Sequence, residues 1–247
     1  MIRVRELAKR YGAQEVLRGV TLEVERGEVA AIIGSSGSGK STFLRCLNGL
    51  ERLDAGTIEI AGTTLRAGVE PALEQRLHAA IRARVGMVFQ QFHLFPHLSV
   101  LANIVEAPTQ VAHRPPEEAR TRAMALLERV GLAGKAQARP STLSGGEQQR
   151  VAIARALAME PEAILFDEPT SALDPRMASE VLSVLADLAH DGLTMVVVTH
   201  AMAFARRAAG RVHVFHEGRV IESGPPEQVL EHPREPATLA LLEIVRG

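Results

Sequence analysis

The chain has 247 residues, of which 46% are hydrophobic and 23% are charged, as in ordinary globular proteins. This length accommodates one or two domains with a large core, and the composition excludes disordered, collagen-like and disulfide-stapled classes. The 28 basic and 29 acidic side chains leave a formal net charge of −1, so we expect no nucleic-acid partner and no general attraction to anionic lipid.

The sequence shows no sign of membrane insertion or secretion. Every apolar run is interrupted by Gly, Pro or charge well before the roughly 20 residues that a membrane span needs. The first twelve residues read MIRVRELAKRYG, in which charges recur too often for a signal peptide. The single cysteine, Cys46, cannot form an intrachain disulfide, which suits a reducing compartment. We therefore expect a cytoplasmic protein.

Alternating strands and helices organise the chain and predict an α/β fold. Short β-branched runs predict strands at residues 2–4, 20–24, 29–33, 57–60, 85–89, 163–166, 195–199, 211–216 and 219–222. Several of these runs are apolar on both faces, as buried parallel strands are. Between residues 91 and 157 the strand signal disappears, and prolines and Gly131 punctuate helical stretches. We interpret this part as a helical subdomain inserted between two portions of one core, residues 1–90 and 158–247, and we expect no regulatory domain to follow.

A phosphate-binding loop follows the strand predicted at residues 29–33. The pattern G-x-x-x-x-G-K-S/T is met by Gly34, Ser35, Ser36, Gly37, Ser38, Gly39, Lys40, Ser41 and Thr42. The glycines let successive N–H groups converge on an anion, and the helix predicted to begin near Lys40 adds the positive end of its dipole. Lys40 is predicted to reach the β and γ phosphates of a nucleotide, and Ser41 to ligate Mg²⁺. An ordinary Gly/Ser turn does not require lysine and a hydroxyl at this offset.

Two acids end the apolar strand predicted at residues 163–166, and one histidine ends the strand after it. Because successive strand residues point to opposite faces, Asp167 and Glu168 are assigned different roles. We assign Asp167 to the Mg²⁺ shell and Glu168 to the general base that polarises the attacking water. His200 is expected beside Glu168, since ligands bind at the carboxyl edge of such sheets. The plainer interpretations are two solvated acids in a turn and a strand-end histidine without a function.

A third motif, Leu143 to Gln148, reads LSGGEQ. Ser144 and Glu147 also form the S-x-x-E pattern of a capping box, which starts a helix. The two glycines weaken a helix start with no evident structural gain, so capping alone does not explain them. Together with the phosphate loop and the acid pair, this motif resembles the signature of the ATP-binding cassette family of transport ATPases, over nearly the whole chain.

The resemblance implies a composite site shared by two copies of the chain. In that family the helix that begins with the signature serine faces the γ phosphate held by the other subunit, so Ser144, Gly145, Gly146 and Gln148 are expected at a partner's nucleotide. Asp174, in the sequence Ser171–Asp174 that resembles a partner-facing loop, is expected there too. Its plainer role is the N-cap of a helix ahead of Pro175, and both roles are compatible.

Further roles follow from the resemblance alone. Tyr11, the only tyrosine, corresponds to the aromatic residue that stacks on adenine, and Gln90 to the glutamine that contacts Mg²⁺ and water and hinges the helical subdomain. The apolar stretch 92–98 corresponds to part of the groove that receives a cytoplasmic helix of a membrane permease; its plainer role is packing within the subdomain. We therefore expect ATP and Mg²⁺ as cofactors and, as partners, a second copy, integral membrane permease subunits and, indirectly, a solute-binding protein. The chain itself is expected at the cytoplasmic face of the membrane, as a peripheral subunit.

The cargo is inferred from similarity only. Residues 86–92, 95–100 and 198–209 are most similar to polar amino acid uptake ATPases, although His93 and Gly210 depart from that subfamily's usual residues. ATPases for methionine or phosphonate import share much of this sequence. An ATPase of envelope or lipoprotein export machinery is a further alternative. A soluble P-loop kinase is the alternative from another class; it would need an acceptor site and has no use for LSGGEQ.

Overall fold

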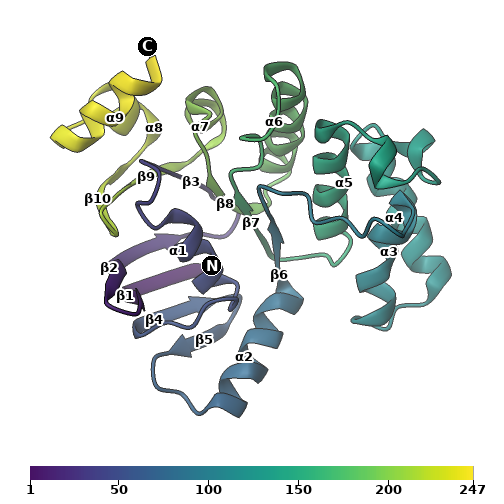
Figure 1. Ribbon diagram of the computed structural model, residues 1–247, viewed down its shortest axis with the longest axis horizontal. Coiled ribbons are helices and arrows are strands. Elements are labelled where there is room, and N and C mark those ends of the chain that lie inside the picture. The colour runs from purple at the N-terminus through teal and green to yellow at the C-terminus, as the bar shows by residue number, and fades with distance from the viewer. Residues whose placement is uncertain (247) are drawn as a thin grey trace.

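The computed structural model describes residues 1–246, with side chains described to Glu243, and contains two β-sheets and a set of helices (Figure 1). The first sheet is antiparallel, with strand order β2-β1-β4-β5. Its strands are β1 (Ile2–Tyr11), β2 (Gln14–Val24), β4 (Ala55–Ile60) and β5 (Thr63–Arg66). Apolar side chains alternate toward the core along β1 and β4, which is the pattern of a sheet with one wet face.

The second sheet carries the buried strands of the core in the order β10-β9-β3-β8-β7-β6, and only the β10–β9 pair is antiparallel. Its strands are β3 (Val29–Gly34), β6 (Val85–Val88), β7 (Ala163–Asp167), β8 (Thr194–Val198), β9 (Arg211–His216) and β10 (Arg219–Gly224). Every residue of β3, β7 and β8 is buried, which explains their two-sided apolar sequences. The expected α/β class is confirmed.

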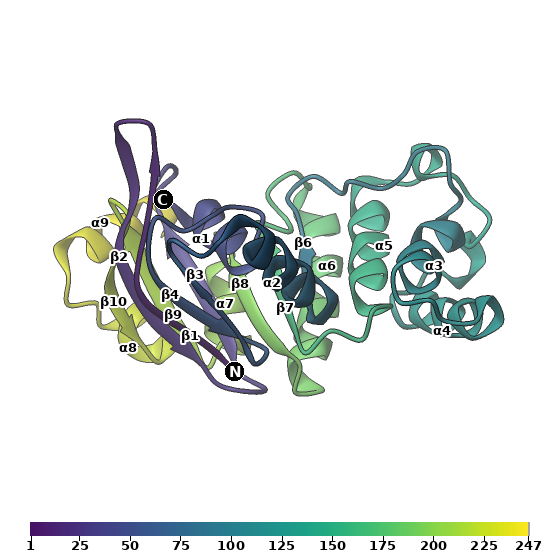
Figure 2. The same cartoon turned by 90° about the horizontal axis from the view of Figure 1, so that it is seen from below.

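Helices cover the parallel sheet and extend away from it at one end (Figures 1 and 2). The helices are α1 (Lys40–Leu47), α2 (Pro71–Arg84), α3 (Val100–Gln110), α4 (Pro116–Arg129), α5 (Gly145–Leu157), α6 (Pro175–His190), α7 (Met202–Ala208), α8 (Pro226–Glu231) and α9 (Pro236–Arg246). Two 3-10 turns, Ala133–Lys135 and Pro140–Thr142, precede α5. Within residues 1–246, no helix combines the length and the apolar character needed to cross a bilayer.

The helical region α3 to α5 shares its core with the parallel sheet. One hydrophobic cluster joins Leu127 of α4 and Ile153 of α5 to Ile164 and Phe166 of β7. Figure 2 shows these helices at the end of the molecule opposite the β1–β2 hairpin. The region therefore projects from the core without having an apolar interior of its own.

The sequence underestimated the antiparallel sheet. Strands β1 and β2 are 10 and 11 residues long, well beyond the predicted runs at 2–4 and 20–24, and β5 was not predicted. Polar and charged residues fill the exposed face of these strands, and register shifts interrupt their pairing. A single-sequence pattern finds such strands poorly, because their pairing partners rather than their own propensities hold them in place.

Candidate nucleotide site

The phosphate loop is fixed by close backbone packing at both of its ends. Gly34 has φ of 153° and Gly39 has φ of 99°. A Cβ at Gly34 would lie 2.2 Å from the carbonyl oxygen of Phe215, and one at Gly39 would lie 2.9 Å from that of Val16. Larger residues at these two positions would therefore displace the loop from the strands that support it.

Lys40 lies at the first position of α1, and its ammonium group is buried inside the loop. The Nζ atom donates hydrogen bonds of 2.8 Å to the carbonyl oxygens of Gly34 and Ser35. Burial lowers the pKa of Lys40, while the charges of Glu168 and Asp167 oppose that shift. An ammonium group has three N–H donors. Two of them are used in the bonds to the loop carbonyls, and the third is available for a phosphate oxygen bound in the loop.

The middle of the loop is held against the β9–β10 turn. Gly218 N donates to Ser38 O at 3.2 Å. Ser38 Oγ is buried without a hydrogen-bond partner within residues 1–246, and it lies 3.0 Å from the position of a Cβ at Gly34, on the side of the loop that packs on β9. The fit to a nucleotide phosphate therefore rests on the buried Lys40 ammonium and on the glycine-dependent curl of the loop.

Asp167 and Ser41 form a pair of oxygen donors next to the loop. Ser41 Oγ donates a 2.8 Å hydrogen bond to Asp167 Oδ1 across 126 positions of sequence. Burial raises the pKa of Asp167, and the hydrogen bond from Ser41 only partly offsets this. A hydroxyl and an under-compensated carboxylate are the ligands that Mg²⁺ takes, so this pair fits the metal. Elsewhere in residues 1–246, no cluster of three or more His, Cys, Asp or Glu side chains could hold a metal ion.

Glu168 and His200 meet at the carboxyl edge of the parallel sheet, as expected from their neighbouring strands. The His200 Nε2 and Glu168 Oε1 atoms are 3.2 Å apart. The reason given for separating Asp167 from Glu168 was wrong, because β7 ends at Asp167 and Glu168 is not a strand residue. Glu168 instead has φ of 47°, in the left-handed region, so the alternation of strand side chains does not apply to it. Such strain in a non-glycine residue costs on the order of 1–3 kcal/mol and recurs at functional sites.

Gln90 and Tyr11 are both exposed. Within residues 1–246, Gln90 has no hydrogen bond to the site, whereas the Tyr11 hydroxyl hydrogen-bonds the side chains of Thr42, at the end of the loop, and Glu51. Gln90 follows β6, which ends one residue before the predicted 85–89 boundary. Tyr11 ends β1 at the tip of the hairpin that projects in Figure 2, and Lys9 Nζ lies 5.1 Å from its ring centroid. The adenine and Mg²⁺ roles of these residues stay predictions.

The signature motif begins α5 in the way that its capping pattern predicts. Ser144 Oγ accepts from Glu147 N at 3.2 Å, and Glu147 Oε2 accepts from Ser144 N at 2.9 Å, which completes a capping box. Gln148 Nε2 donates to Leu143 O at 3.1 Å. The start of this helix is thus fixed within the chain, independently of any ligand.

The inference that the signature glycines have no structural gain was wrong. A Cβ at Gly145 would lie 2.9 Å from Leu173 Cδ2, and one at Gly146 would lie 2.9 Å from Met177 Cβ. Both glycines therefore let α5 pack closely against the start of α6. That contact was invisible in the sequence, because 28 or more positions separate the partners.

Asp174 is the N-cap of α6, and its Oδ1 accepts from Met177 N at 2.9 Å. It lines one hollow of about 370 Å³ together with Ser144, Arg150 and Glu180. The N-caps of α5 and α6, Ser144 and Asp174, therefore lie at the same hollow. Both views place α5 and α1 on opposite sides of β7 (Figures 1 and 2). The predicted site residues thus form two groups within one chain: the loop with Asp167, Glu168 and His200, and the helix starts with Ser144 and Asp174.

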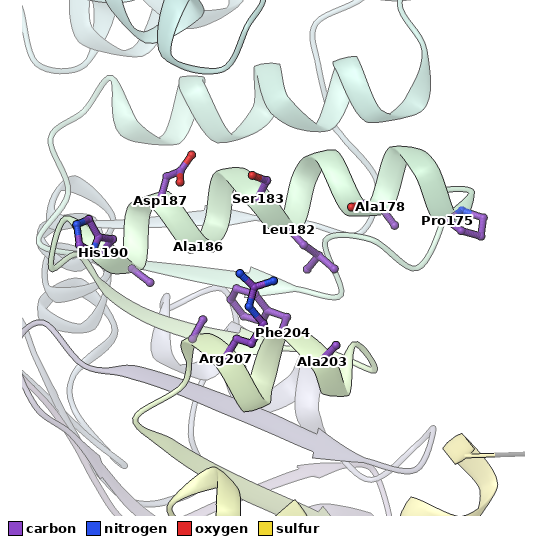
Figure 3. Close-up of a pocket in the computed structure, with 13 residues that line it drawn as sticks. Pro175, Ala178, Leu182, Ser183, Ala186, Asp187, His190, Ala203, Phe204 and Arg207 are labelled. Atoms are coloured by element: carbon purple, nitrogen blue, oxygen red, sulfur yellow. The ribbon is translucent and has the colours of Figure 1, made fainter.

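A larger hollow of about 760 Å³ lies between α6 and α7 and contains none of the predicted site residues (Figure 3). Small side chains such as Ala178, Ala186 and Ala203 line it, together with Asp187 and with Arg207, which projects from α7 toward α6. The small side chains leave the space between these two helices unfilled. The phosphate loop, by contrast, is an open surface cup whose chemistry lies in its N–H and hydroxyl groups.

Sequence reasoning missed the residues that hold the loop from outside. The β9–β10 turn reaches the loop through Gly218, and the same Gly218 accepts from Arg18 N at 2.9 Å. A Cβ at Gly218 would lie 2.4 Å from Val16 O. The dipeptide Glu217–Gly218 marked a turn in the sequence, but only the tertiary structure shows that this turn supports a binding loop.

A buried parallel strand, a glycine-rich anion cup with an embedded lysine, and two acids at the neighbouring strand end define a nucleotide-hydrolysing protein of the P-loop class. A family model described as "ABC transporter" matches residues 17–171. The chain belongs to the ABC transporter family and is one of its ATPases. This confirms the expected resemblance and ATP as the nucleotide.

Relatives extend over nearly the whole chain. The arginine transport ATP-binding protein ArgV of Corynebacterium glutamicum is 53% identical, covering 96% of this chain and 95% of its own. The histidine/lysine/arginine/ornithine transport ATP-binding protein HisP of Escherichia coli is 50% identical, covering 95% of this chain and 94% of its own. Among solved structures, the dimeric ABC transporter cassette MJ0796 has a TM-score of 0.80 at 37% identity and covers 92% of this chain and 99% of its own.

Proposed function

We propose that this chain hydrolyses ATP to energise the import of polar amino acids through a membrane permease. The observation that carries the catalytic part is the convergence of Lys40, Asp167 and Glu168 at one strand edge, with Ser41 bonded to Asp167. The cargo class is supported by similarity to amino acid transport ATP-binding proteins at 50–53% identity over nearly the full length. Similarity of this extent does not favour the methionine, phosphonate, export or kinase alternatives.

The phosphates are bound by the loop from Gly34 to Thr42. The backbone N–H groups of the loop donate to the phosphate oxygens. These groups include the N–H groups of Ser35, Ser36, Gly37 and Gly39. Lys40 donates to the same anion with the one N–H of its ammonium group that the loop carbonyls leave unpaired. Tyr11 stacks on the adenine at the hairpin tip.

Mg²⁺ fits Ser41 and Asp167, with Gln90 as a third contact. When bound, the metal ion supplies positive charge that stabilises the charge developing on the phosphate oxygens. Asp167 is held in place for this by the 2.8 Å bond from Ser41. The raised pKa of Asp167 means that its carboxylate lacks compensation from the protein alone, which a cation provides.

Glu168 accepts the proton of the attacking water, and His200 orients that carboxylate. The 3.2 Å contact between His200 Nε2 and Glu168 Oε1 restricts one carboxylate oxygen and leaves the other free to face the water. The left-handed backbone at Glu168 holds the side chain at the sheet edge. A second role of His200 in this proposal is a hydrogen bond to the γ phosphate.

A second copy of the chain completes the site. Ser144, Gly145 and Gly146 present the N-terminal end of α5 to the γ phosphate on the partner, with Gln148 and Asp174 beside them. ATP then closes the dimer, because each nucleotide contacts two chains. Hydrolysis removes the γ phosphate that joins them, so the dimer opens. A dimeric cassette among the structural neighbours supports this assembly. The helical subdomain, residues 91–157, positions the N-terminal end of α5 at Ser144. Residues 1–90 and 158–247 form the core.

The transporter contains membrane permease subunits, and this chain lies at their cytoplasmic face. A neighbour in the solved structures, CbiO1 of Clostridium perfringens, is part of an ABC transporter complex; it has a TM-score of 0.82 at 31% identity and covers 99% of this chain and 97% of its own. A solute-binding protein outside the membrane delivers the amino acid to the permease.

The experiment is reconstitution of the whole transporter in proteoliposomes. ATP is supplied on the side of the membrane where this chain lies. We expect ATP-dependent uptake of labelled arginine or histidine, competition by other polar amino acids, and release of free phosphate. Uptake of methionine or phosphonate in their place would assign another cargo. Transfer of phosphate from ATP to a small acceptor by the purified chain would contradict the transport function.

A further inference from the structure

The hairpin end of β1 is tied to the segment that follows α1. Asp54 Oδ2 accepts a hydrogen bond from Arg10 N at 2.6 Å, and Asp54 N donates to Ala8 O at 2.9 Å. In the same segment, Glu51 N donates to Arg45 O of α1 at 3.1 Å. Since α1 begins at the phosphate loop, these bonds set the position of the strand end relative to the loop.

Lys9 is a buried cation at this end of the strand. It is 8% exposed, and lysine is rarely buried to this extent unless an acid pairs with it. Its Nζ atom lies 3.4 Å from Glu51 Oε2, and the side chains of the pair are 10% and 27% exposed. The two charges therefore attract each other in partly desolvated surroundings, where such an interaction is stronger than at the open surface.

The same two side chains border Tyr11 on different sides. Lys9 Nζ lies over the ring, 5.1 Å from its centroid, and so covers one face. The Tyr11 hydroxyl hydrogen-bonds the side chains of Glu51 and of Thr42, which ends the phosphate loop. Tyr11 is nevertheless 44% exposed. The ring thus has a held hydroxyl, one covered face and one face that is open to a flat partner next to the loop.

We infer that Lys9 and Glu51 are positioning residues for the nucleotide base: they orient the Tyr11 ring so that the base stacks on the face that Lys9 does not cover. This inference rests on the proposed function, in which Tyr11 stacks on adenine. The bond to Thr42 places the ring beside the residues that hold the phosphates, so one nucleotide spans both. Because the ring is held before the base arrives, less side-chain entropy is lost on binding.

The test compares ADP with pyrophosphate, which carries the same phosphates and has no base. ADP is used because this ATPase does not hydrolyse it. Titration calorimetry gives both Kd values, and their ratio isolates the contribution of the base. Tyr11 is the only tyrosine and the chain has no tryptophan, so tyrosine emission reports on this ring alone. We expect the emission to fall when a base stacks on the ring.

Lys9→Met keeps an unbranched apolar side chain and removes the ammonium group. We expect ADP to bind about fivefold more weakly, with a smaller fall in tyrosine emission and an unchanged Kd for pyrophosphate. Glu51→Gln removes the charge that pairs with Lys9, and we expect about threefold weaker ADP binding. Arg10→Met is the matched control, because Arg10 is the adjacent basic residue of β1, with a side chain that is 63% exposed and faces Glu15. It binds both ligands as the wild type does.

A double-mutant cycle shows whether Lys9 acts through the ring. Tyr11→Leu removes the stacking surface, and we expect roughly tenfold weaker ADP binding. In that background Lys9→Met changes the Kd for ADP less than twofold, because no ring is left to orient. A full Lys9 effect without the ring would mean that Lys9 does not act through Tyr11, which overturns the inference.

The remaining outcomes distinguish this inference from the proposed function. Normal ADP binding by both Lys9→Met and Glu51→Gln, with weakened binding by Tyr11→Leu, overturns the positioning role and leaves Tyr11 as the adenine contact. Equal loss of ADP and pyrophosphate binding in Lys9→Met also overturns it, since the effect would not concern the base. Unchanged ADP binding by Tyr11→Leu would instead contradict the adenine role of Tyr11 in the proposed function.

Discussion

The phosphate loop and the start of α5 are the two places where we propose that the nucleotide is contacted, and the chain organises them differently. At the loop, Lys40 and Asp167 are buried, bonded within the chain and shifted in pKa by that burial. At the start of α5, Ser144 is half-buried and its hydroxyl already caps Glu147 N. The loop side is pre-organised by strand ends, whereas the α5 side is a helix cap that is complete without a ligand.

The largest expected effect tests whether the residues that hydrolyse ATP all lie with the phosphate loop and none with the start of α5. Glu168→Gln removes the general base and keeps the size of the side chain, so we expect kcat to fall by about 10²-fold or more while ATP still binds. Single-turnover phosphate release and nucleotide binding measure the two quantities separately. The same variant accumulates an ATP-bound dimer on a sizing column. Near-normal turnover would remove Glu168 from this role.

A second prediction concerns the sheet beneath the loop. Burial, with Arg211 nearby, lowers the pKa of His213 on β9 from 6.5 to about 4. Its Nε2 is buried without a partner, so protonation would create an unsatisfied N–H. The unfolded state binds the proton first, so the free energy of unfolding falls by about 3 kcal/mol as the pH drops from 6.5 to 4. Urea unfolding at a series of pH values measures this.

Controls for this pH dependence come from two histidines. His213→Gln removes the titrating group and flattens the pH dependence of stability between 6.5 and 4. His97→Gln changes an exposed histidine and leaves that dependence as in the wild type. An unchanged profile in His213→Gln would assign acid sensitivity to other groups.

Removing the loop's cation has the next largest expected effect. Lys40→Ala deletes a buried ammonium that holds the carbonyls of Gly34 and Ser35 and faces the phosphates. Charge-assisted hydrogen bonds contribute about 1.5–3 kcal/mol, so the Kd for ATP rises roughly 10- to 100-fold. Titration calorimetry measures the Kd. Equal affinity in Lys40→Ala would exclude this side chain as a phosphate contact.

The smallest effect tests the packing account of the signature. Gly146→Ala places a Cβ 2.9 Å from Met177 Cβ, and overpacking of this kind costs about 1–3 kcal/mol of stability. Gly134→Ala meets nothing within 4 Å and serves as the control. Thermal unfolding of both variants makes the comparison. If both variants unfold alike, the close contact between α5 and α6 is not what requires glycine at position 146.

Local sequence was sufficient for the loop side of the site. The residues from Gly34 to Thr42 lie next to one another in the chain, and Asp167 and Glu168 follow a short apolar run, so spacing and strand order predicted their meeting. Failures came where partners are distant in sequence. The signature glycines pack on Leu173 and Met177, and Glu168 has a left-handed backbone where strand alternation was expected.

The sequence by itself determined the α/β class, the phosphate loop and the caps of α5 and α6, because each depends on residues within a few positions of one another. The tertiary structure decided three other things: the extent of the antiparallel sheet, the burial that shifts the pKa of Lys40 and Asp167, and the placement of Lys9 and Glu51 beside Tyr11. These depend on contacts between elements and on the exclusion of water, which a local pattern does not encode.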